Sequence, residues 1–494
     1  MKHLLQLLVP LLILAGCRSR EEIPTPDREA INTLIQQGEY ARASRCIKLK
    51  IAADEDLTPL EKYELAFQAD VLERIKQDFT KNDTSVIAYI KKFHPEVTDE
   101  ELAAWERSGA LECKLINGEK KYFYNAHRNL FRISRQARQY MPEANGRQSD
   151  CLDIFLGKYI PQVVEKAEHT PGNPGKLVMP VKMKITYTLT VKPNEVPDGE
   201  MIRVWMPYPR ETVKQKNIQL LAASRKEYII SPDSYPHKSI YMEQRAVKDS
   251  AAVFSYTLAF TSYNLWFDFK PSDVKPYQTE SGLYKKYTAE RAAHVRFTPD
   301  IKRLTDSLTA GEPNPYLKAV KIFDYIAQNY PWASAREYST LANIPQYVLD
   351  NKHGDCGQQS LLFITMARYA GIPAKWQSGW MLHPGEVNLH DWAEAYFEGI
   401  GWVPVDQSFG YVYREGLSGQ AAREQENVYR FFTRGLDAYR YIVNEDFSGD
   451  FFPAKIYPRS ETVDFQRGEV EWRGENLYFG RWRYKMKVEY LQGT

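Results

Sequence analysis

Three residues between Asn351 and Ser408 carry side chains that together could perform acyl-transfer chemistry. Cys356 offers a thiol, His390 an imidazole and Asp406 a carboxylate, in this order along the chain. A thiol becomes a strong nucleophile when a neighbouring base takes its proton, and a carboxylate can hold that base in the productive tautomer. The segment therefore predicts a nucleophile, its general base and the group that orients the base.

The residues around Cys356 predict that this cysteine begins a helix. The turn-like residues 352–355 precede it, and the largely apolar run LLFITMARYA follows and stops at Gly371 and Pro373. Unpaired N–H groups and the positive end of the helix dipole at such a position favour a thiolate. Asp355 is the predicted N-cap, and its negative charge would oppose the thiolate slightly.

The residues after His390 predict a β-hairpin. The run HDWAEAYF alternates as a strand does, glycines turn the chain, and WVPVD returns to Asp406. His390 and Asp406 are an even number of positions apart, so their side chains share a face of the hairpin only if the loop holds an odd number of residues. A five-residue loop from Phe397 to Gly401 pairs Tyr396 with Trp402 and leaves His390 diagonal to Asp406. A two-residue loop would separate the two side chains.

Four motifs in this order resemble the transglutaminase-like core, a branch of the papain-like thiol fold. They are GDC at 354–356, GIPA at 371–374, HDWAE at 390–394 and GWVPVD at 401–406. The resemblance extends upstream, because exported bacterial members of the family carry a β-sandwich before the core.

The resemblance implies that the thiol attacks a carboxamide or peptide carbonyl, while the imidazole carries the proton and the carboxylate orients the imidazole. The Cys356 backbone N–H and one side chain from upstream would hold the oxyanion. Trp332 is the candidate for that side chain, with Gln328 and Tyr338 behind it. No cofactor or metal is expected, since the sequence contains no acidic loop with calcium-ligand spacing.

The same machinery allows two enzymatic outcomes and one that is not enzymatic. Water would resolve the acyl-enzyme in a cysteine peptidase or amidase, which we favour for a cell-envelope lipoprotein acting on peptides or proteins, including cell-wall peptides. A lysine amine would resolve it in a protein-glutamine gamma-glutamyltransferase, which cross-links proteins. The third possibility is a binding or scaffold lipoprotein with a vestigial thiol core.

The N-terminus predicts export and a lipid anchor. Residues 1–17 combine a basic start, an apolar run of about a dozen residues and the ending Leu-Ala-Gly-Cys, which resembles a bacterial lipobox with Cys17 as the lipidated residue. An ordinary signal peptide is the alternative. Residues 18–27 predict a polar tether. No later run reaches the ~18 apolar residues of a membrane span, so lipid alone would anchor the chain to the bacterial cell envelope, facing the periplasm or the outer surface.

Length and pattern predict a multidomain α+β protein. The 494 residues correspond to roughly two to four domains. We expect an all-helical domain at 28–167, with N-caps at Thr58 and Thr98, an antiparallel β-sandwich at 176–270, a papain/transglutaminase-like catalytic core at 276–420, and a C-terminal helix with strands at 421–494 that complete or flank the core.

Some positions predict details of the catalytic core. Leu317, Val320, Phe323 and Ile326 recur at helical spacing and predict the core-facing stripe of one helix, with Ile322 less well placed. Residues 421–443 predict another helix.

The remaining polar and cysteine residues receive structural interpretations. Glu394 is expected to pair with a neighbouring residue, while His353 and His383 are expected at the surface. A net charge of +2 provides no field to attract nucleic acid, so no such partner is expected. Cys46, Cys113 and Cys151 lack metal-ligand spacing, and export would allow a disulfide between two of them, although the sequence selects no pair.

Overall fold

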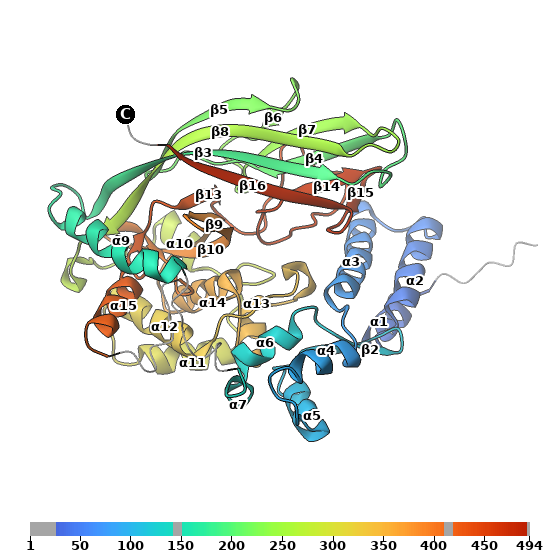
Figure 1. The fold of residues 1–494 in the computed structure, drawn as a ribbon, viewed down its shortest axis with the longest axis horizontal. Coiled ribbons are helices and arrows are strands. Elements are labelled where there is room, and N and C mark those ends of the chain that lie inside the picture. Colours follow the sequence, from blue (N-terminus) through green and yellow to red (C-terminus); the bar gives the residue numbers. More distant parts are fainter. Residues whose placement is uncertain (1–25, 142–150, 410–417, 492–494) are drawn as a thin grey trace, which may run out of the picture.

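The computed structural model describes residues 26–141, 151–409 and 418–491 (Figure 1). Helices and several antiparallel sheets alternate along the chain, which confirms the predicted multidomain α+β class. The predicted signal segment, Cys17 and most of the tether lie outside the described residues. Within the described ranges, no helix has both the length and the apolar character needed to cross a membrane.

The N-terminal region is mainly helical and lies to one side of the molecule (Figure 1). Capping boxes at Thr58 and Thr98 start two of its helices, as predicted. The prediction of an all-helical domain is wrong at one place, where two short strands form a hairpin. The elements are α1 (Arg28–Gln36), α2 (Tyr40–Ala53), α3 (Pro59–Asp78), α4 (Asp83–Ile90), α5 (Asp99–Arg107), β1 (Cys113–Ile116), β2 (Glu119–Tyr122), α6 (Ala126–Ile133) and α7 (Arg135–Arg138).

The next helix, α9 (Cys151–Glu168), does not share the hydrophobic core of this region. Its buried residues Leu156, Ile160 and Val163 belong to the core that surrounds the catalytic helices. The N-terminal helical core therefore ends near Ala137, and α9 packs with the elements predicted further along the chain.

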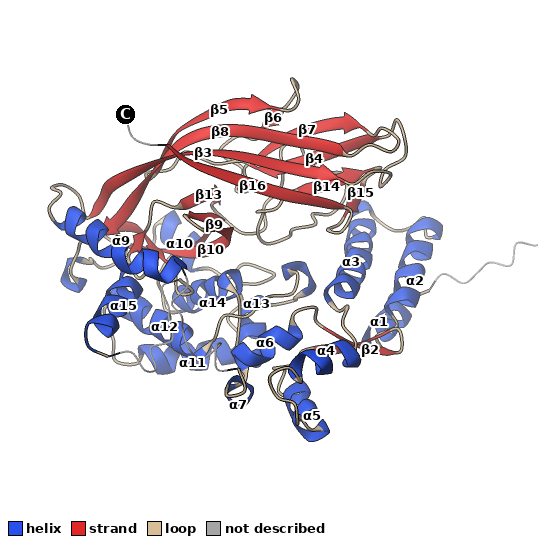
Figure 2. Ribbon diagram, viewed as in Figure 1, coloured by secondary structure: helices blue, strands red, loops and turns tan. Residues whose placement is uncertain are grey.

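Two stacked sheets form the sandwich at the top of Figure 2. Their strands from the middle of the chain are β3 (Gly175–Val191), β4 (Met201–Pro207), β5 (Gln215–Ala223), β6 (Ile229–Ile230), β7 (Ser239–Arg245) and β8 (Ala252–Phe267). Strands from the C-terminal region complete both sheets, namely β12 (Gly435–Leu436), β14 (Glu469–Trp472), β15 (Glu475–Leu477) and β16 (Trp482–Leu491). β16 pairs with β3, and β14 pairs with β4, so most C-terminal strands finish the sandwich and not the catalytic sheet.

The region from Pro271 to Asn444, predicted to hold the catalytic core, contains one four-stranded sheet in the order β11-β10-β9-β13. Its strands are β9 (Ala374–His383), β10 (Glu386–Phe397), β11 (Gly401–Val405) and β13 (Arg440–Asn444). Its helices are η1 (Pro271–Asp273), α10 (Gly282–Thr288), α11 (Pro299–Thr309), α12 (Pro315–Asn329), η2 (Tyr338–Thr340), α13 (Ile344–Asn351), α14 (Cys356–Tyr369) and α15 (Gly419–Phe431).

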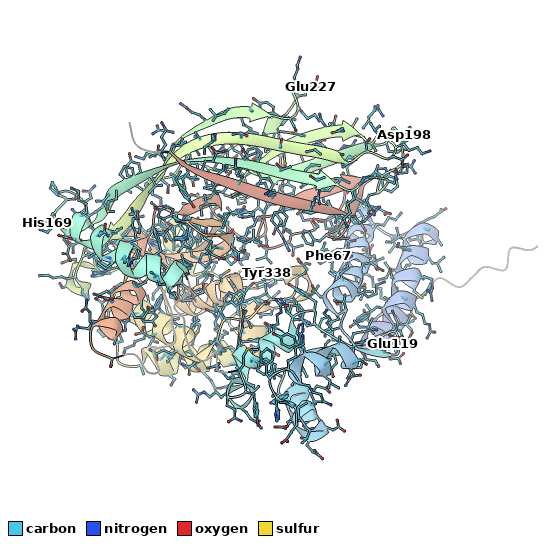
Figure 3. All side chains as sticks on the ribbon, viewed as in Figure 1. Phe67, Glu119, His169, Asp198, Glu227 and Tyr338 are labelled. Carbon is cyan, nitrogen blue, oxygen red and sulfur yellow. The ribbon has the colours of Figure 1, made fainter. Side chains whose placement is uncertain are left out.

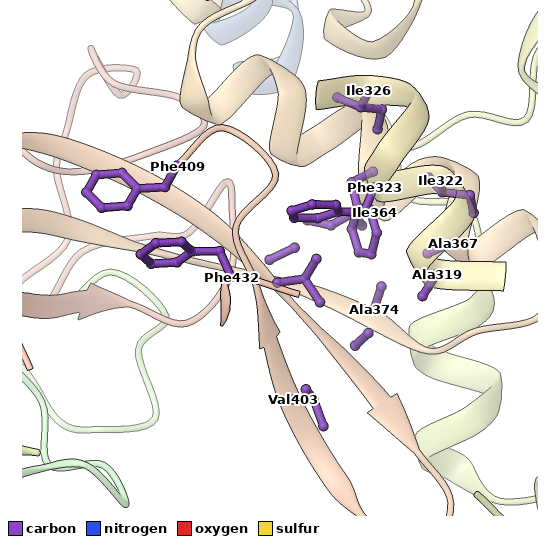
Figure 4. Packing of buried hydrophobic residues seen from close by; sticks show 14 of the residues in the cluster. Ala319, Ile322, Phe323, Ile326, Ile364, Ala367, Ala374, Val403, Phe409 and Phe432 are labelled. Atoms are coloured by element: carbon purple, nitrogen blue, oxygen red, sulfur yellow. The ribbon is translucent and has the colours of Figure 1, made fainter. Parts of the chain in front are cut away.

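One face of the catalytic sheet packs on α14 and α12 (Figure 4). Ile364 and Ala367 of α14 contact a cluster that includes Ala374 and Val403 of the sheet. The other face contributes Trp380 to the core of the sandwich. The sheet thus lies between the nucleophile helix and the sandwich.

Two predictions about this region need correction. The helix expected over residues 421–443 ends at Phe431, and β13 begins nine residues later at Arg440. On α12, Ile322 is fully buried, while Leu317 and Val320 are only partly buried, because the helix also packs Tyr316 and Ala319 inward and its buried face is therefore rotated.

Two of the cysteines considered for a disulfide, Cys46 and Cys113, are free thiols. Both lie partly buried against the N-terminal helical core. The side chain of Cys151 lies outside the described residues. The described cysteines form no disulfide with one another.

Candidate active site

Cys356 is the first residue of α14, as predicted. Asp355 is the N-cap, and its Oδ1 accepts hydrogen bonds from the Gln358 N–H at 3.0 Å and from the Tyr338 hydroxyl at 2.6 Å. Figure 3 shows Tyr338 near the centre of the molecule. A capping box in which Gln358 also reaches back to the Asp355 N–H fixes the direction in which the helix starts.

Gly357 lets other groups close over this helix start. A Cβ at this position would lie 2.8 Å from Asp391 Oδ2 and still closer to the Tyr338 hydroxyl. No side chain fits there without moving those groups. The absence of a side chain at Gly357 therefore allows β10 and η2 to approach the backbone beside the thiol.

The predicted hairpin is present with the predicted register, but its loop is shorter than the predicted five residues. Tyr396 pairs with Trp402, and the further pair of Phe397 with Gly401 leaves residues 398–400 as the loop, which keeps the odd number that the parity argument requires. His390 Nε2 lies 2.7 Å from Asp406 Oδ2, and both side chains are buried. The diagonal contact predicted from parity is thus the contact observed.

The thiol itself meets the residue next to the histidine. Cys356 Sγ lies 3.5 Å from Asp391 Oδ2, and the Gln466 amide donates to Asp391 Oδ1 at 2.7 Å. Among the described residues, no hydrogen bond joins the thiol to the His390 imidazole. The sequence analysis did not assign Asp391, although its place beside His390 in the HDWAE motif offered a signal.

Strand alternation explains this arrangement. Ala393 and Ala395 of β10 pack in the core with α14, so Asp391 has the same parity and points toward the nucleophile helix. Trp392 packs instead with residues of β12 and β13, and His390 shares its parity. The thiol and the imidazole nevertheless line the same cavity, which has a volume of about 620 Å³.

Comparison with known proteins places the segment that contains these residues in a family. Residues 302–407 match the model of the transglutaminase-like superfamily, a stretch that contains Cys356, His390 and Asp406. Residues 302–407 form a transglutaminase-like domain.

Other similarities are more distant. A stretch of 131 residues is 26% identical to the uncharacterized protein YebA of Bacillus subtilis (strain 168), covering 22% of this chain and 18% of that protein. A solved structure of a "Putative Cysteine Protease" from Cytophaga hutchinsonii is 14% identical, covers 65% of this chain and 94% of its own, and gives a TM-score of 0.43. The periplasmic domain of TgpA from Pseudomonas aeruginosa is 12% identical, covers 54% and 100%, and gives 0.27.

Within the transglutaminase-like domain, the environment of the thiol favours the neutral form. Burial, followed by the carboxylates of Asp391 and Asp355, raises the pKa of Cys356 well above its ordinary value. These surroundings oppose the thiolate that the helix start alone was expected to favour. Burial also lowers the pKa of His390, against the opposing effect of Asp406. At neutral pH the imidazole is consequently uncharged and able to accept a proton.

Carboxylates crowd the thiol side of the cavity. Burial raises the pKa of Asp355 and of Asp464 to about 6, and that of Glu461 to about 8. Arg467 is the nearby cation, and its guanidinium binds both Glu461 and Glu337. The positive charge of Arg467 is thus already paired with these two carboxylates.

The three oxyanion candidates of the transglutaminase-like domain differ in whether they line the cavity. Trp332 lines the cavity with 44% of its surface exposed, and it forms a β-bridge with Gly354 two residues before the nucleophile. Gln328 is exposed on the last turn of α12 and does not line the cavity, so that candidate is wrong. Tyr338 lines the cavity, with its hydroxyl donating to Asp355.

Three polar residues considered near the site have structural surroundings. Glu394 pairs with Lys375 at 3.0 Å, as expected of a structural partner. His353 and His383 are buried, so their expected surface location is wrong. Burial lowers the pKa of His353 to about 4, and His383 Nε2 lies 3.0 Å from Asp437 Oδ1.

Proposed function

We propose that the protein is a thiol-dependent acyl-transfer enzyme that hydrolyses peptide or amide bonds through Cys356, His390 and Asp406. The observation that carries this proposal is the shared cavity, in which a thiol at a helix start and an imidazole bound at 2.7 Å by a buried carboxylate line one space. A transglutaminase-like domain supports a thiol enzyme in general.

The reaction would begin with both partners neutral. As the sulfur bonds to the substrate carbonyl carbon, the thiol proton passes to His390, and the carbonyl oxygen gains negative charge. The Cys356 N–H, which lacks an intrahelical partner at the helix start, and the Trp332 indole N–H would stabilise this oxygen. His390 would then protonate the leaving amine, releasing it from an acyl-enzyme that water hydrolyses.

Asp406 has a defined part in this sequence. Its carboxylate accepts the hydrogen bond from His390 Nε2, which leaves Nδ1 as the nitrogen that exchanges protons with sulfur and substrate. The negative charge also stabilises the imidazolium formed during attack.

Peptide hydrolysis by the purified protein, compared with its Cys356→Ala variant, tests the proposal. A mixed peptide library, including cell-wall peptides, should be cleaved by the wild type only. Cleavage that survives in Cys356→Ala would contradict the assignment of the nucleophile. Glu394→Gln is a matched control, because Glu394 lies on the same strand as His390 and pairs outside the cavity.

Amine transfer is the second candidate function, since the same acyl-enzyme can react with an amine. A labelled primary amine offered with a glutamine-containing protein separates the two outcomes. Incorporation of the amine faster than peptide cleavage or ammonia release would favour the gamma-glutamyltransferase. A scaffold with a vestigial site would instead show neither peptide cleavage nor amine incorporation, in the wild type as in Cys356→Ala.

We further propose that a lipid on Cys17 anchors the enzyme to the bacterial cell envelope, facing the periplasm or the outer surface. The lipobox-like ending of residues 1–17 supports this placement. Labelling cells with a palmitate analogue should mark the wild type in the membrane fraction. The Cys17→Ser variant should lose the label and the membrane association.

A further inference from the structure

Arg440 on β13 lies directly behind the imidazole–carboxylate pair. Its side chain is completely buried, and Nη1 forms an ion pair with Asp406 Oδ2 at 3.1 Å. Nε donates to Asp437 Oδ2 at 2.9 Å. The guanidinium therefore connects the Asp406 carboxylate to the carboxylate of Asp437, which lies three residues before Arg440 in the chain. Arg440 lies beyond residues 302–407, which match the transglutaminase-like family.

We propose that Arg440 is a positioning residue that fixes Asp406 and limits the basicity of His390. The inference rests on the proposed function, in which His390 accepts the thiol proton. Asp406 Oδ2 faces both the imidazole and the guanidinium, so its negative charge is shared between them.

Aromatic rings fix the guanidinium in this place. The Arg440 guanidinium carbon lies 4.0 Å from the ring centre of Phe409, 5.5 Å from that of Trp392 and 5.6 Å from that of Phe432. Phe409 also lies beside His390, with ring centres 4.9 Å apart. Cation–π contacts on a buried arginine leave few alternative rotamers, so the rings hold the guanidinium beside Asp406 although Nη1 donates no hydrogen bond to it.

A buried arginine needs compensating charge, and Asp437 supplies it. Arg440, His383 and Lys214 hold the pKa of Asp437 far below its ordinary value, against the effect of burial. Asp437 is therefore ionised at neutral pH. Its charge keeps Arg440 in place even when Asp406 interacts with a newly formed imidazolium.

The charged groups that face His390 come from several elements. Asp406 follows β11 and stabilises the imidazolium, whereas Arg440 of β13 and His383 of β9 oppose its formation. Lys214, just before β5, lies near Asp437, and burial lowers the pKa of its ammonium to about 7. Its Nζ donates to Ser262 on β8. The sandwich thus contributes one end of the charge network that reaches the triad.

Removal of the Arg440 cation should raise the His390 pKa, because Asp406 would then stabilise the imidazolium without competition. In Arg440→Met, the His390 pKa measured by ¹H–¹⁵N NMR titration should rise by about one unit. The acid limb of the pH profile of kcat/KM should move to higher pH by the same amount. His390→Ala identifies the resonance, and the titration is informative whichever reaction the enzyme catalyses.

Two further variants separate positioning from folding. Arg434→Met is the control, since Arg434 is partly buried on the same segment, contacts Trp266 and Phe269, and lies away from the triad. It should leave the His390 pKa and the pH profile unchanged. Arg440→Lys keeps a cation but lacks the fork that reaches both carboxylates, so its His390 pKa should stay near the wild-type value while kcat falls roughly tenfold.

A folded Arg440→Met with an unshifted His390 pKa and pH profile would overturn the proposal. If Arg440→Met does not fold, Arg440→Lys decides, and full activity in that variant would overturn the positioning role. A wild type without hydrolytic activity but with the expected NMR shift in Arg440→Met would contradict the proposed function and leave the coupling between Arg440 and His390 intact.

Discussion

The two sides of strand β10 surround the proposed catalytic groups with different electrostatic environments. On the side of α14, the Cys356 thiol lies against Asp391 and near Asp355, and burial together with these carboxyl groups disfavours its ionisation. On the other side, Asp406 lies between the His390 imidazole and the Arg440 guanidinium, and burial together with the Arg440 cation lowers the pKa of the imidazole. The difference means that neither the thiol nor the imidazole is charged before substrate arrives.

This contrast defines when the proton moves. A preformed thiolate–imidazolium pair needs an environment that stabilises both ions, and the thiol side does not provide it. Proton transfer from Cys356 to His390 is therefore expected to accompany attack on the carbonyl. The nucleophile would then be weakly reactive toward small electrophiles and strongly reactive toward a bound substrate.

Loss of the Asp406 charge, on the side of β10 that faces Arg440, should have the largest effect. In Asp406→Asn, the imidazole loses the charge that stabilises its protonated form, and kcat/KM should fall by about 10²–10⁴-fold. Steady-state peptide hydrolysis measures the loss, with Glu394→Gln as the control on the adjacent strand. A decrease below about threefold would show that Asp406 is not the orienting group.

A loss of one oxyanion donor should come next. Trp332→Phe removes the indole N–H and retains a ring beneath the Arg132 guanidinium, which lies 4.8 Å from the present ring centre. The kcat should fall by about 10²-fold, since the donor acts chiefly in the transition state. Trp402→Phe is the control, because Trp402 packs against Tyr396 and Lys375 outside the cavity. An unchanged kcat would show that the Trp332 indole does not act with the Cys356 N–H as an oxyanion donor.

On the side of β10 that faces α14, one carboxyl group next to Cys356 can be replaced by an amide of the same shape. Burial raises the pKa of Asp391 well above its ordinary value. Asp391→Asn removes the negative charge that this carboxyl carries once ionised, 3.5 Å from the thiol, while retaining an acceptor for the Gln466 amide. The pKa of Cys356 should fall, and its alkylation rate at a fixed pH of about 8 should rise by roughly tenfold for a decrease of one pKa unit. If the rate stays the same, burial alone sets the thiol pKa.

The smallest effect is expected at the outer edge of the acidic region. Burial and the Glu337 carboxylate raise the pKa of Asp78 to about 8 in the folded protein. Because this folded value exceeds the unfolded one near 3.9, the folded state loses stability as pH rises from about 4 to 8. Asp78→Asn should therefore raise the unfolding free energy by about 1 kcal/mol or more at pH 8, with a smaller gain toward pH 4.

Chemical denaturation at several pH values measures this gain. Glu55→Gln, an exposed change in the same helical region, should have no comparable effect. A gain in Asp78→Asn that is independent of pH would indicate repacking and not relief of charge.

The sequence predicted the parts of the site that local patterns determine. Parity along the hairpin located His390 against Asp406, and the capping signal at Asp355 located Cys356 at a helix start. These contacts depend on residues close together in the chain, where periodicity and turn chemistry are informative. The position of Trp332 beside the cavity also agreed with expectation, whereas exposed Gln328 did not.

The sequence could not predict groups that arrive from distant elements. Arg440 was assigned to a helix, because its strand is short and follows α15 closely. Gln466, which holds Asp391, lies in an irregular segment with no periodic pattern. The neutral state of the thiol also escaped prediction, since it depends on burial and on carboxylates brought near by tertiary packing.

The long pairing of β16 with β3 has a consequence for how the enzyme is made. Residues 482–491 close a sheet that begins at Gly175, and β13 enters the catalytic sheet from the same late part of the chain. Such pairings between distant segments form slowly and only after both partners have been synthesised. A nascent chain that already contains Cys356 and His390 still lacks the strand that carries Arg440. The order of synthesis therefore delays the completed catalytic centre until most of the polypeptide is available to fold.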